Sequence, residues 1–147
     1  MADDIFDASV YRPTGGFMGA PNRYDLEACR LAVLGMPFDC GVHPTRVGSR
    51  QGPAAIRDQS GLVRPYQPPH ADFNPLEVLG VVDCGDAVCL PGRPEPSFEV
   101  MEEAVWRIAS RGPATLTMGG DGTVTLPQLR AWKRVHADLC VLHIDAH

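Results

Sequence analysis

Four short apolar segments are spread along the chain, at 31–38, 77–87, 114–122 and 139–147. Near-continuous apolar runs of this length are typical of strands that are buried on both faces of a parallel sheet. Each run ends in proline, glycine or ionisable residues, which indicates that a loop begins there. The pattern therefore predicts four buried strands whose carboxyl ends lead into polar loops.

Three segments between these runs have helical features. Residues 53–60 begin with a proline, which fits the first turn of a helix because its missing N–H has no partner there. After Ser97, a candidate N-cap, apolar residues recur at three- and four-residue steps until Gly112. Residues 123–136 accept Pro127 only if it lies in the first turn, and Leu126, Leu129 and Trp132 or Lys133 are expected on the inner face of this helix. We expect helices in all three segments.

Strands that alternate with helices at this spacing predict right-handed βαβ units, and hence an α/β fold with an open parallel sheet covered by helices on both faces. Ligands bind such sheets beyond the carboxyl ends of the strands. That rule selects four polar clusters, namely the loop after Phe38, 83–86, 119–122 and 143–147. The first 25 residues are polar and without a period, so we expect an arm or surface coil there.

The composition narrows the class of protein. A chain of 147 residues that is 44% hydrophobic and 21% charged fits one globular domain. The formal net charge of −5 has the wrong sign for binding nucleic acid. No membrane span or signal peptide is found, and five cysteines without a CxxC pair suit buried or free thiols in a reducing compartment. The sequence therefore predicts a cytoplasmic protein.

The segment HIDAH at the end of the last run carries three side chains suited to metal binding. Alternate side chains of a strand share one face, so His143, Asp145 and His147 are expected to point the same way. Carboxylate and imidazole groups suit Mn, Zn, Ni or Fe, and an aspartate can bridge two ions. The alternative is a polar strand end in which His143 is a hydrogen-bonded core histidine.

The GGDG segment, residues 119–122, precedes a predicted helix. The backbone N–H groups at that helix end are one possible anion cradle. The alternative is a tight strand-to-helix turn that needs positive φ angles. Neither a Walker motif nor a dinucleotide fingerprint is present, so a nucleotide-binding domain has no support.

The loop after Phe38 mixes glycine, proline and arginine without a period, and loops of this length are more often functional than passive. His43 lies in it and is a candidate for contact with a substrate. The alternative for His43 is an ordinary exposed histidine.

Four segments, in this order, resemble the ureohydrolase family of arginases, agmatinases and guanidino-acid hydrolases. LGMPFD with TRVGSRQGPAAIR is similar to the agmatinase segment that leads into the first helix, and VVDCGD is similar to a strand of the family that ends in an acidic turn. MGGDGTVTLP resembles the family motif GGDHSxTxP, and HIDAH resembles the first part of its DAHxD motif. The resemblance spans residues 31–147.

The resemblance implies a three-layer α/β/α sandwich around a larger parallel sheet. Residues 26–147 would form the first half of this arginase-like domain, behind an N-terminal arm of residues 1–25. It also implies a homo-oligomer, either a trimer or a hexamer, with which the arm is compatible.

The family uses a pair of metal ions, usually Mn²⁺ and in some members Ni²⁺, to bind a hydroxide that attacks a guanidinium carbon and releases urea. By motif, Asp145 would bridge both ions, His147 would bind one of them, and His143 would orient a ligand. The implied function is that of an agmatinase-like, metal-dependent hydrolase of a guanidino compound.

Two departures from the family pattern bear on this function. A metal-binding histidine follows GGD in the family, whereas Gly122 has no side chain, and Asp121 beside it is expected only to support a ligand. The chain also ends at His147, before the second aspartate of DAHxD and a downstream DxDxxDP segment. We therefore expect the chain alone to be inactive. The alternative is a non-catalytic ureohydrolase-like subunit that lost a metal ligand at Gly122.

Overall fold

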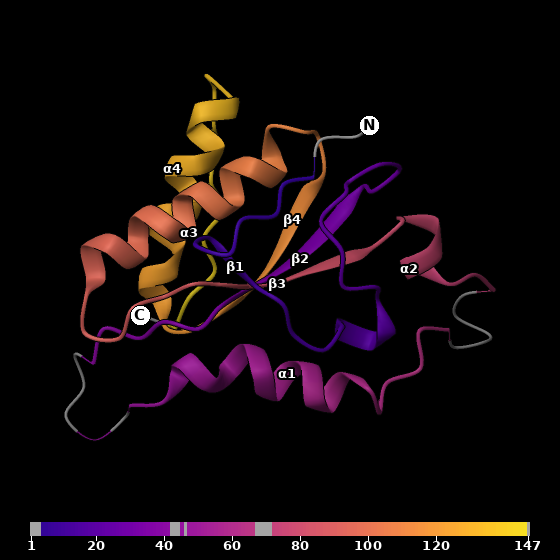
Figure 1. Cartoon of the computed structure of the whole chain (residues 1–147), viewed down its shortest axis with the longest axis horizontal. Coiled ribbons are helices and arrows are strands. Elements are labelled where there is room, and N and C mark those ends of the chain that lie inside the picture. Colours follow the sequence, from indigo (N-terminus) through magenta and orange to yellow (C-terminus); the bar gives the residue numbers. More distant parts are fainter. Residues whose placement is uncertain (1–3, 42–44, 46, 67–71, 147) are drawn as a thin grey trace.

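The fold is built around one four-stranded sheet. The computed structural model describes residues 4–41, 45, 47–66 and 72–146. Across the sheet the strands lie in the order β1, β3, β2, β4 (Figure 1). The three longer strands are parallel: β2 (Leu31–Met36), β3 (Val82–Ala87) and β4 (Ala114–Gly119). At one edge, β1 (Tyr11–Arg12) pairs with β3 in the antiparallel sense.

Helices cover both faces of the sheet, which makes three layers (Figure 1). On one face lies α1 (Gly52–Ser60), and on the other lie α3 (Pro94–Ala109) and α4 (Thr125–Val135). A short helix, α2 (Pro75–Val78), leads into β3. Single 3-10 turns form at Phe17–Gly19, Ser49–Gln51 and Gly122–Val124. The predicted α/β/α arrangement is thus confirmed, and none of the described helices is long and apolar enough to cross a membrane.

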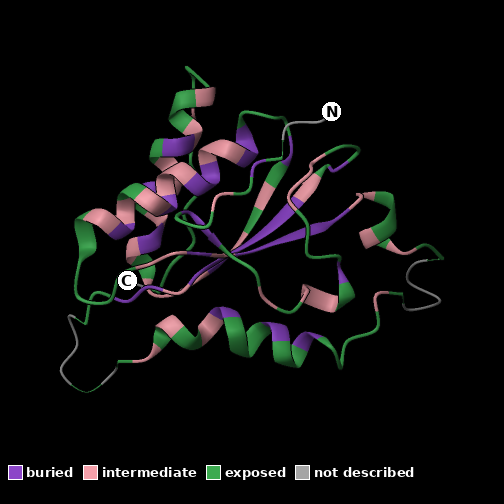
Figure 2. Ribbon diagram, viewed as in Figure 1, coloured by how far each residue is buried: buried purple, intermediate pink, exposed green. Residues whose placement is uncertain are grey.

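The larger of two clusters of buried apolar side chains lies between the sheet and α3, and the smaller, which includes Val33, lies on the other face of the sheet. Figure 2 shows buried positions along the strands and on α3. In β2, which has a partner strand on each side, Ala32, Val33 and Leu34 are all fully buried. The apolar stripe of α3 supplies Met101, Val105 and Ile108, each also at 0% exposure. The helical period predicted for this segment therefore identifies the face that packs on the sheet.

The described part of the N-terminal arm packs on its own chain instead of lying over the surface as a coil. Tyr11 is 1% exposed, and its hydroxyl donates to the Ala104 carbonyl of α3 over 2.7 Å. Ile5 and Val10 are buried in the same cluster. The arm is polar in sequence, but these few apolar side chains are enough to fix it against the edge of the sheet.

Several element boundaries differ from the predicted ones. β3 begins at Val82 and not at residue 77, because Asn74 caps α2 by accepting from the Leu76 N–H over 3.0 Å. α3 begins at Pro94, ahead of Ser97. Ser97 is not the N-cap: it is fully buried, and its hydroxyl donates to the Arg93 carbonyl over 2.8 Å.

The inner face of α4 is also shifted from the prediction. Pro127 and Ala131 are its buried residues, whereas Leu126, expected on this face, is 44% exposed. Polar contacts join α4 to β4: Gln128 accepts from the Thr117 hydroxyl over 2.6 Å, and the Trp132 indole N–H donates to Thr115 over 3.2 Å. The threonines of β4 therefore select which face of the helix turns inward.

The strand predicted at 139–147 is wrong for its described residues, 139–146, which form an extended coil. This coil runs back along α4 toward the end of the sheet where the parallel strands finish (Figure 1). Val141, Leu142 and Ile144 are 48%, 88% and 87% exposed. A strand buried on both faces needs a neighbouring strand and a cover for each face, and among the described residues none pairs with this segment.

Hydrogen exchange should separate this coil from the sheet. We expect the amides of residues 141–146 to exchange without measurable protection, while those of Val33 and Leu34 in β2 exchange only through large openings of the fold. Exchange monitored by NMR in neutral buffer would measure both sets in one sample. Protection of alternate amides in 141–146 would contradict the coil and indicate a paired strand.

Candidate functional site

The loop that follows β2 meets the turn that follows β4 at the carboxyl ends of the strands. The Gly120 N–H donates to the Met36 carbonyl over 3.2 Å, and the Asp121 N–H donates to the Phe38 carbonyl over 3.1 Å. A Cβ on Gly120 would lie 1.8 Å from the Phe38 oxygen. The close approach of two backbones therefore requires glycine at 120.

Asp121 ties the two loops together with its side chain. One carboxylate oxygen accepts from the Cys40 N–H over 2.9 Å and from its thiol over 3.2 Å. The other accepts from the N–H of Thr123 over 3.0 Å and from its hydroxyl. Partial burial opposes ionisation, but the hydrogen bonds from Thr123 and Cys40 outweigh it and lower the pKa of Asp121. Both oxygens are thus used to hold the turn.

The two interpretations of the GGDG segment can now be compared with its geometry. None of its glycines has a positive φ, so the requirement is close approach at Gly120 and not a left-handed turn. The N–H groups of Gly120, Asp121 and Thr123 already donate within the protein. They are therefore not free to cradle an anion.

Gly122 stands where the family motif GGDHSxTxP has its histidine. It is exposed, and a Cβ built on it would meet nothing within 4 Å. Its φ lies outside the left-handed region. The local backbone therefore has room for a larger side chain, and the absence of a ligand here follows from the residue and not from crowding.

Asp39 fixes the described ends of the loop after β2 to each other. Its carboxylate accepts from the N–H groups of Gly48 and Arg50 over 3.2 and 3.0 Å, and from the Arg50 guanidinium over 3.0 and 2.5 Å. The hydrogen bonds from the Arg50 side chain and backbone hold the pKa of Asp39 well below its usual range. Asp39 therefore stays ionised and closes the loop at neutral pH.

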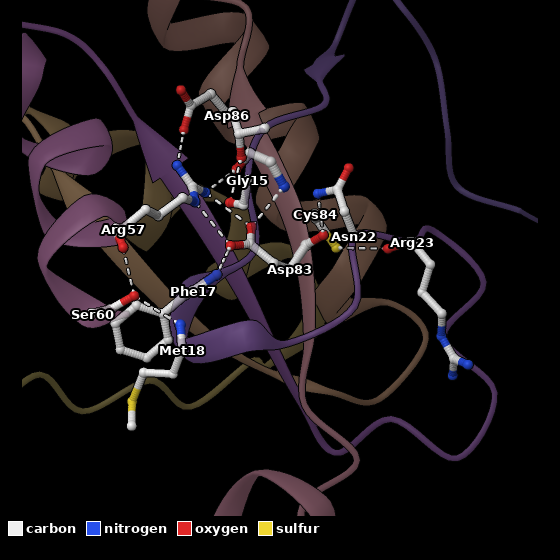
Figure 3. Close-up of polar contacts among 12 residues, drawn as sticks. Gly15, Phe17, Met18, Asn22, Arg23, Arg57, Ser60, Asp83, Cys84 and Asp86 are labelled. Atoms are coloured by element: carbon white, nitrogen blue, oxygen red, sulfur yellow. Dashed lines mark hydrogen bonds and ion pairs between the residues drawn. The ribbon is translucent and has the colours of Figure 1, made fainter. Parts of the chain in front are cut away.

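A buried cluster of charged side chains lies between α1 and β3 (Figure 3). Arg57 of α1 makes two parallel bonds to Asp83 of β3, over 2.8 and 2.9 Å, and a third to Asp86 over 2.6 Å. The Arg57 side chain is 5% exposed and that of Asp83 is 0% exposed. Burial alone would lower the pKa of Arg57, but the bonds to the two aspartates raise it, so the arginine stays charged.

The pairing of Arg57 with Asp83 did not follow from the sequence pattern, because the two residues are separated by 26 positions. One signal was present: an arginine on a short helix and two carboxylates, Asp83 and Asp86, in an otherwise apolar strand. Charges in such places are almost always paired.

The predicted metal ligands are only partly within the described chain. His143 Nε2 lies 3.6 Å from Asp145, and these side chains are 59% and 40% exposed. His147 and His43 lie outside the described residues. Within the part of the chain that the structure describes, no three histidine, cysteine or acidic side chains come together as a metal site. These residues do not by themselves fit a metal pair.

Comparison with known proteins places these features in a family. The profile of the arginase family matches residues 29–147. A guanidinobutyrase of Pseudomonas aeruginosa is 37% identical over 84% of this chain and 38% of its own length. An agmatinase of Shigella sonnei is 36% identical over 97% of this chain and 47% of its own length.

The fold has a counterpart among solved structures. Proclavaminate amidino hydrolase from Streptomyces clavuligerus superposes with a TM-score of 0.82 and 30% identity, over 93% of this chain and 45% of that protein. The chain thus spans less than half the length of each of these relatives.

Substitution of two glycines of the same turn tests its geometry. We expect Gly120→Ala to lower the free energy of unfolding by about 1–3 kcal/mol, because the added methyl collides with the Phe38 carbonyl. Gly122→Ala, the matched control, meets open space and should change stability by less than about 0.5 kcal/mol. Urea unfolding of both variants measures the difference. Equal effects would show that the two loops do not approach as described.

The pH dependence of stability tests the closure of the loop by Asp39. The pKa of this carboxyl is lowered in the folded state, so its contribution is present above the unfolded pKa near 4 and is lost as the pH falls through the folded value. We expect Asp39→Asn to lower the urea midpoint by roughly 0.5–1 M at pH 7. The difference in urea midpoint between this variant and the unsubstituted protein should narrow below about pH 4.

A control with the same charge change is Asp25→Asn. Asp25 forms an ion pair with Arg23 at 3.5 Å, and both side chains are more than two-fifths exposed. Loss of this exposed ion pair should change the free energy of unfolding by less than about 0.5 kcal/mol. If Asp39→Asn behaved like this control, the closure would not contribute to the fold.

Proposed function

The chain belongs to the arginase family, and from this premise we propose that it is part of a hydrolase that releases urea from a guanidino compound. The observation that carries the proposal is the family match over residues 29–147, together with two relatives that are named for guanidino substrates. The place where the loop after β2 meets the turn after β4, here called the site edge, supports this proposal. The family motifs LGMPFD and MGGDGTVTLP are joined there by direct hydrogen bonds.

The substrate class follows from what the relatives share. Guanidinobutyrase and proclavaminate amidino hydrolase are named for a guanidino and an amidino group, and agmatinase is named for agmatine, a guanidino compound; the rest of the substrate differs among the three. In the proposed reaction, water adds to the guanidino carbon, a C–N bond breaks, and urea and an amine leave. Among these compounds we propose an agmatine-like substrate, and His43 as a residue of the substrate loop.

A metal pair, Mn²⁺ or alternatively Ni²⁺, is part of this proposal. By resemblance to the family motif, Asp145 and His147 would be its ligands, with His143 and Asp121 in supporting roles. The described residues do not complete such a site. We therefore propose that the chain on its own does not turn over substrate, and that it works in the cytoplasm as part of a trimer or hexamer.

A second function has its own supporting observation. Gly122 provides no ligand although its surroundings would admit one, since a Cβ there meets nothing within 4 Å. A subunit that keeps the fold and lacks a ligand would bind its homologues and not hydrolyse substrate. The alternative proposal is thus a non-catalytic subunit of a ureohydrolase assembly.

Urea release with metal analysis separates the two functions. The chain and any longer product of the same reading frame are supplied with Mn²⁺ or Ni²⁺ and with agmatine, 4-guanidinobutyrate and arginine. We expect urea from one compound and two metal ions per subunit for the longer product, and neither for residues 1–147 alone.

Two variants make this assay specific. Asp145→Ala should abolish both urea release and metal binding, while Asp138→Ala, an exposed acid in the same coil, should leave both unchanged. One metal ion or none, without urea from any compound, would overturn the hydrolase and favour the non-catalytic subunit.

A further inference from the structure

The buried cluster of Arg57, Asp83 and Asp86 has no role in the proposed reaction, yet it is the most extensively bonded charged group among the described residues. Arg57 uses its Nε and both Nη atoms, including a bond from Nη2 to the Gly85 carbonyl over 2.8 Å. Each oxygen of Asp83 also accepts a backbone N–H, from Phe17 and from Gly85, both over 2.8 Å. A guanidinium paired in this way has one permitted position and orientation.

This cluster fixes α1 relative to two other parts of the chain. Through Arg57 it holds α1 to β3, and through Asp83 it holds the N-terminal arm. Ser60, at the end of α1, adds a second link to the arm by accepting from the Met18 N–H over 2.8 Å and donating to the Arg57 carbonyl over 2.7 Å. Figure 3 shows these bonds joining three segments, namely α1, β3 and the N-terminal arm.

The other end of α1 points to the candidate site. A Cβ on Gly52, the first residue of α1, would lie 2.6 Å from the Gly119 carbonyl at the end of β4. A Cβ on Gly35 of β2 would lie 1.8 Å from the Asp86 carboxylate and 2.9 Å from Pro53. The helix thus has no space to slide along the sheet while Arg57 remains paired.

A short series of contacts leads from α1 to the turn after β4. The 3-10 turn Ser49–Gln51 runs directly into α1 and carries Arg50, which is bonded to Asp39. The residue after Asp39 is Cys40, whose N–H donates to Asp121. The position of α1 therefore sets where Asp39 and Cys40 can meet the turn that contains Asp121.

We propose that Arg57 is a positioning residue: its buried pairs with Asp83 and Asp86 lock α1 on the sheet, and through α1 they hold the loop at Asp39–Cys40 against the turn at Asp121. The inference rests on the proposed function only in treating this junction as part of a hydrolase site.

The test compares Arg57→Lys with Arg107→Lys by amide hydrogen exchange. Lysine keeps the charge of Arg57 but not its forked pairing. We expect exchange at Cys40, Arg50 and Asp121 to rise roughly tenfold or more beyond any rise at Val33 and Leu34 in β2, whose rates follow the stability of the whole fold. Arg107 is the matched control, because it pairs with Glu103 and Asp7 on the α3 side, and its replacement should leave the three site amides unchanged.

Two results would overturn the proposal. One is no change at Cys40 and Asp121, and the other is an equal rise in the β2 amides, which would show general loosening of the fold. If Arg57→Lys does not fold, Asp86→Asn decides, because it removes one partner and leaves the paired bonds to Asp83 in place. Its expected effect is a smaller rise at the same three amides.

The readout does not require turnover, so the two proposals can fail separately. Absence of urea in the assay of the longer product counts against the hydrolase. Unchanged exchange at the junction counts against positioning by Arg57, whatever the protein catalyses.

Discussion

A guanidinium that is always charged and almost completely buried must be paired, and this requirement organises one face of the sheet. Arg57 stays protonated at any pH at which the protein is folded. With only 5% of its side chain exposed, it gains little from water. An unpaired charge in such a place costs several kcal/mol. The fold therefore has to bring α1, β3 and the N-terminal arm together at one point.

The close backbone contacts at the site edge depend on that arrangement. Gly35, Gly52 and Gly120 each lie where a Cβ would come within 3.0 Å of another group. Such glycines bring α1, β2 and the turn after β4 nearer to one another than side chains would allow. The hydrogen bonds of Asp121 to Cys40 and Thr123 then hold the junction at its final spacing. The site edge is thus shaped by backbone approach and two carboxylates, Asp39 and Asp121.

The sequence pattern predicts the parts of this fold that depend on local apolar content. The strand at Leu31–Met36 and the stripe of Met101, Val105 and Ile108 follow from it, because each run is buried by neighbours that any α/β sheet provides. The observed starts of β3 and α3 differ from the predicted ones. Capping by Asn74 and the prolines at the start of α3 act over only a few residues, so the longer apolar pattern does not reveal them.

The features that the pattern does not predict depend on contacts between distant positions. Apolar alternation at 139–146 indicates a strand, yet a strand exists only where another strand pairs with it, and none of the described strands does. The partners of Arg57 lie 26 and 29 positions away, on a strand whose alignment with α1 is set by the whole fold. Family resemblance identified the segments that meet at the site edge. It could not show that both carboxylate oxygens of Asp121 accept hydrogen bonds from Cys40 and Thr123.

Gly120 and Gly122 stand two residues apart and have opposite physical roles. The first is required by the approach of the Phe38 carbonyl, whereas the second is surrounded by open space. A Cβ at 122 therefore has room without displacing the turn. A metal ligand at this position is an addition to a turn that other residues build. The side chain at 122 can therefore change without altering the fold, because the turn is held by the close approach at Gly120 and by the hydrogen bonds of Asp121.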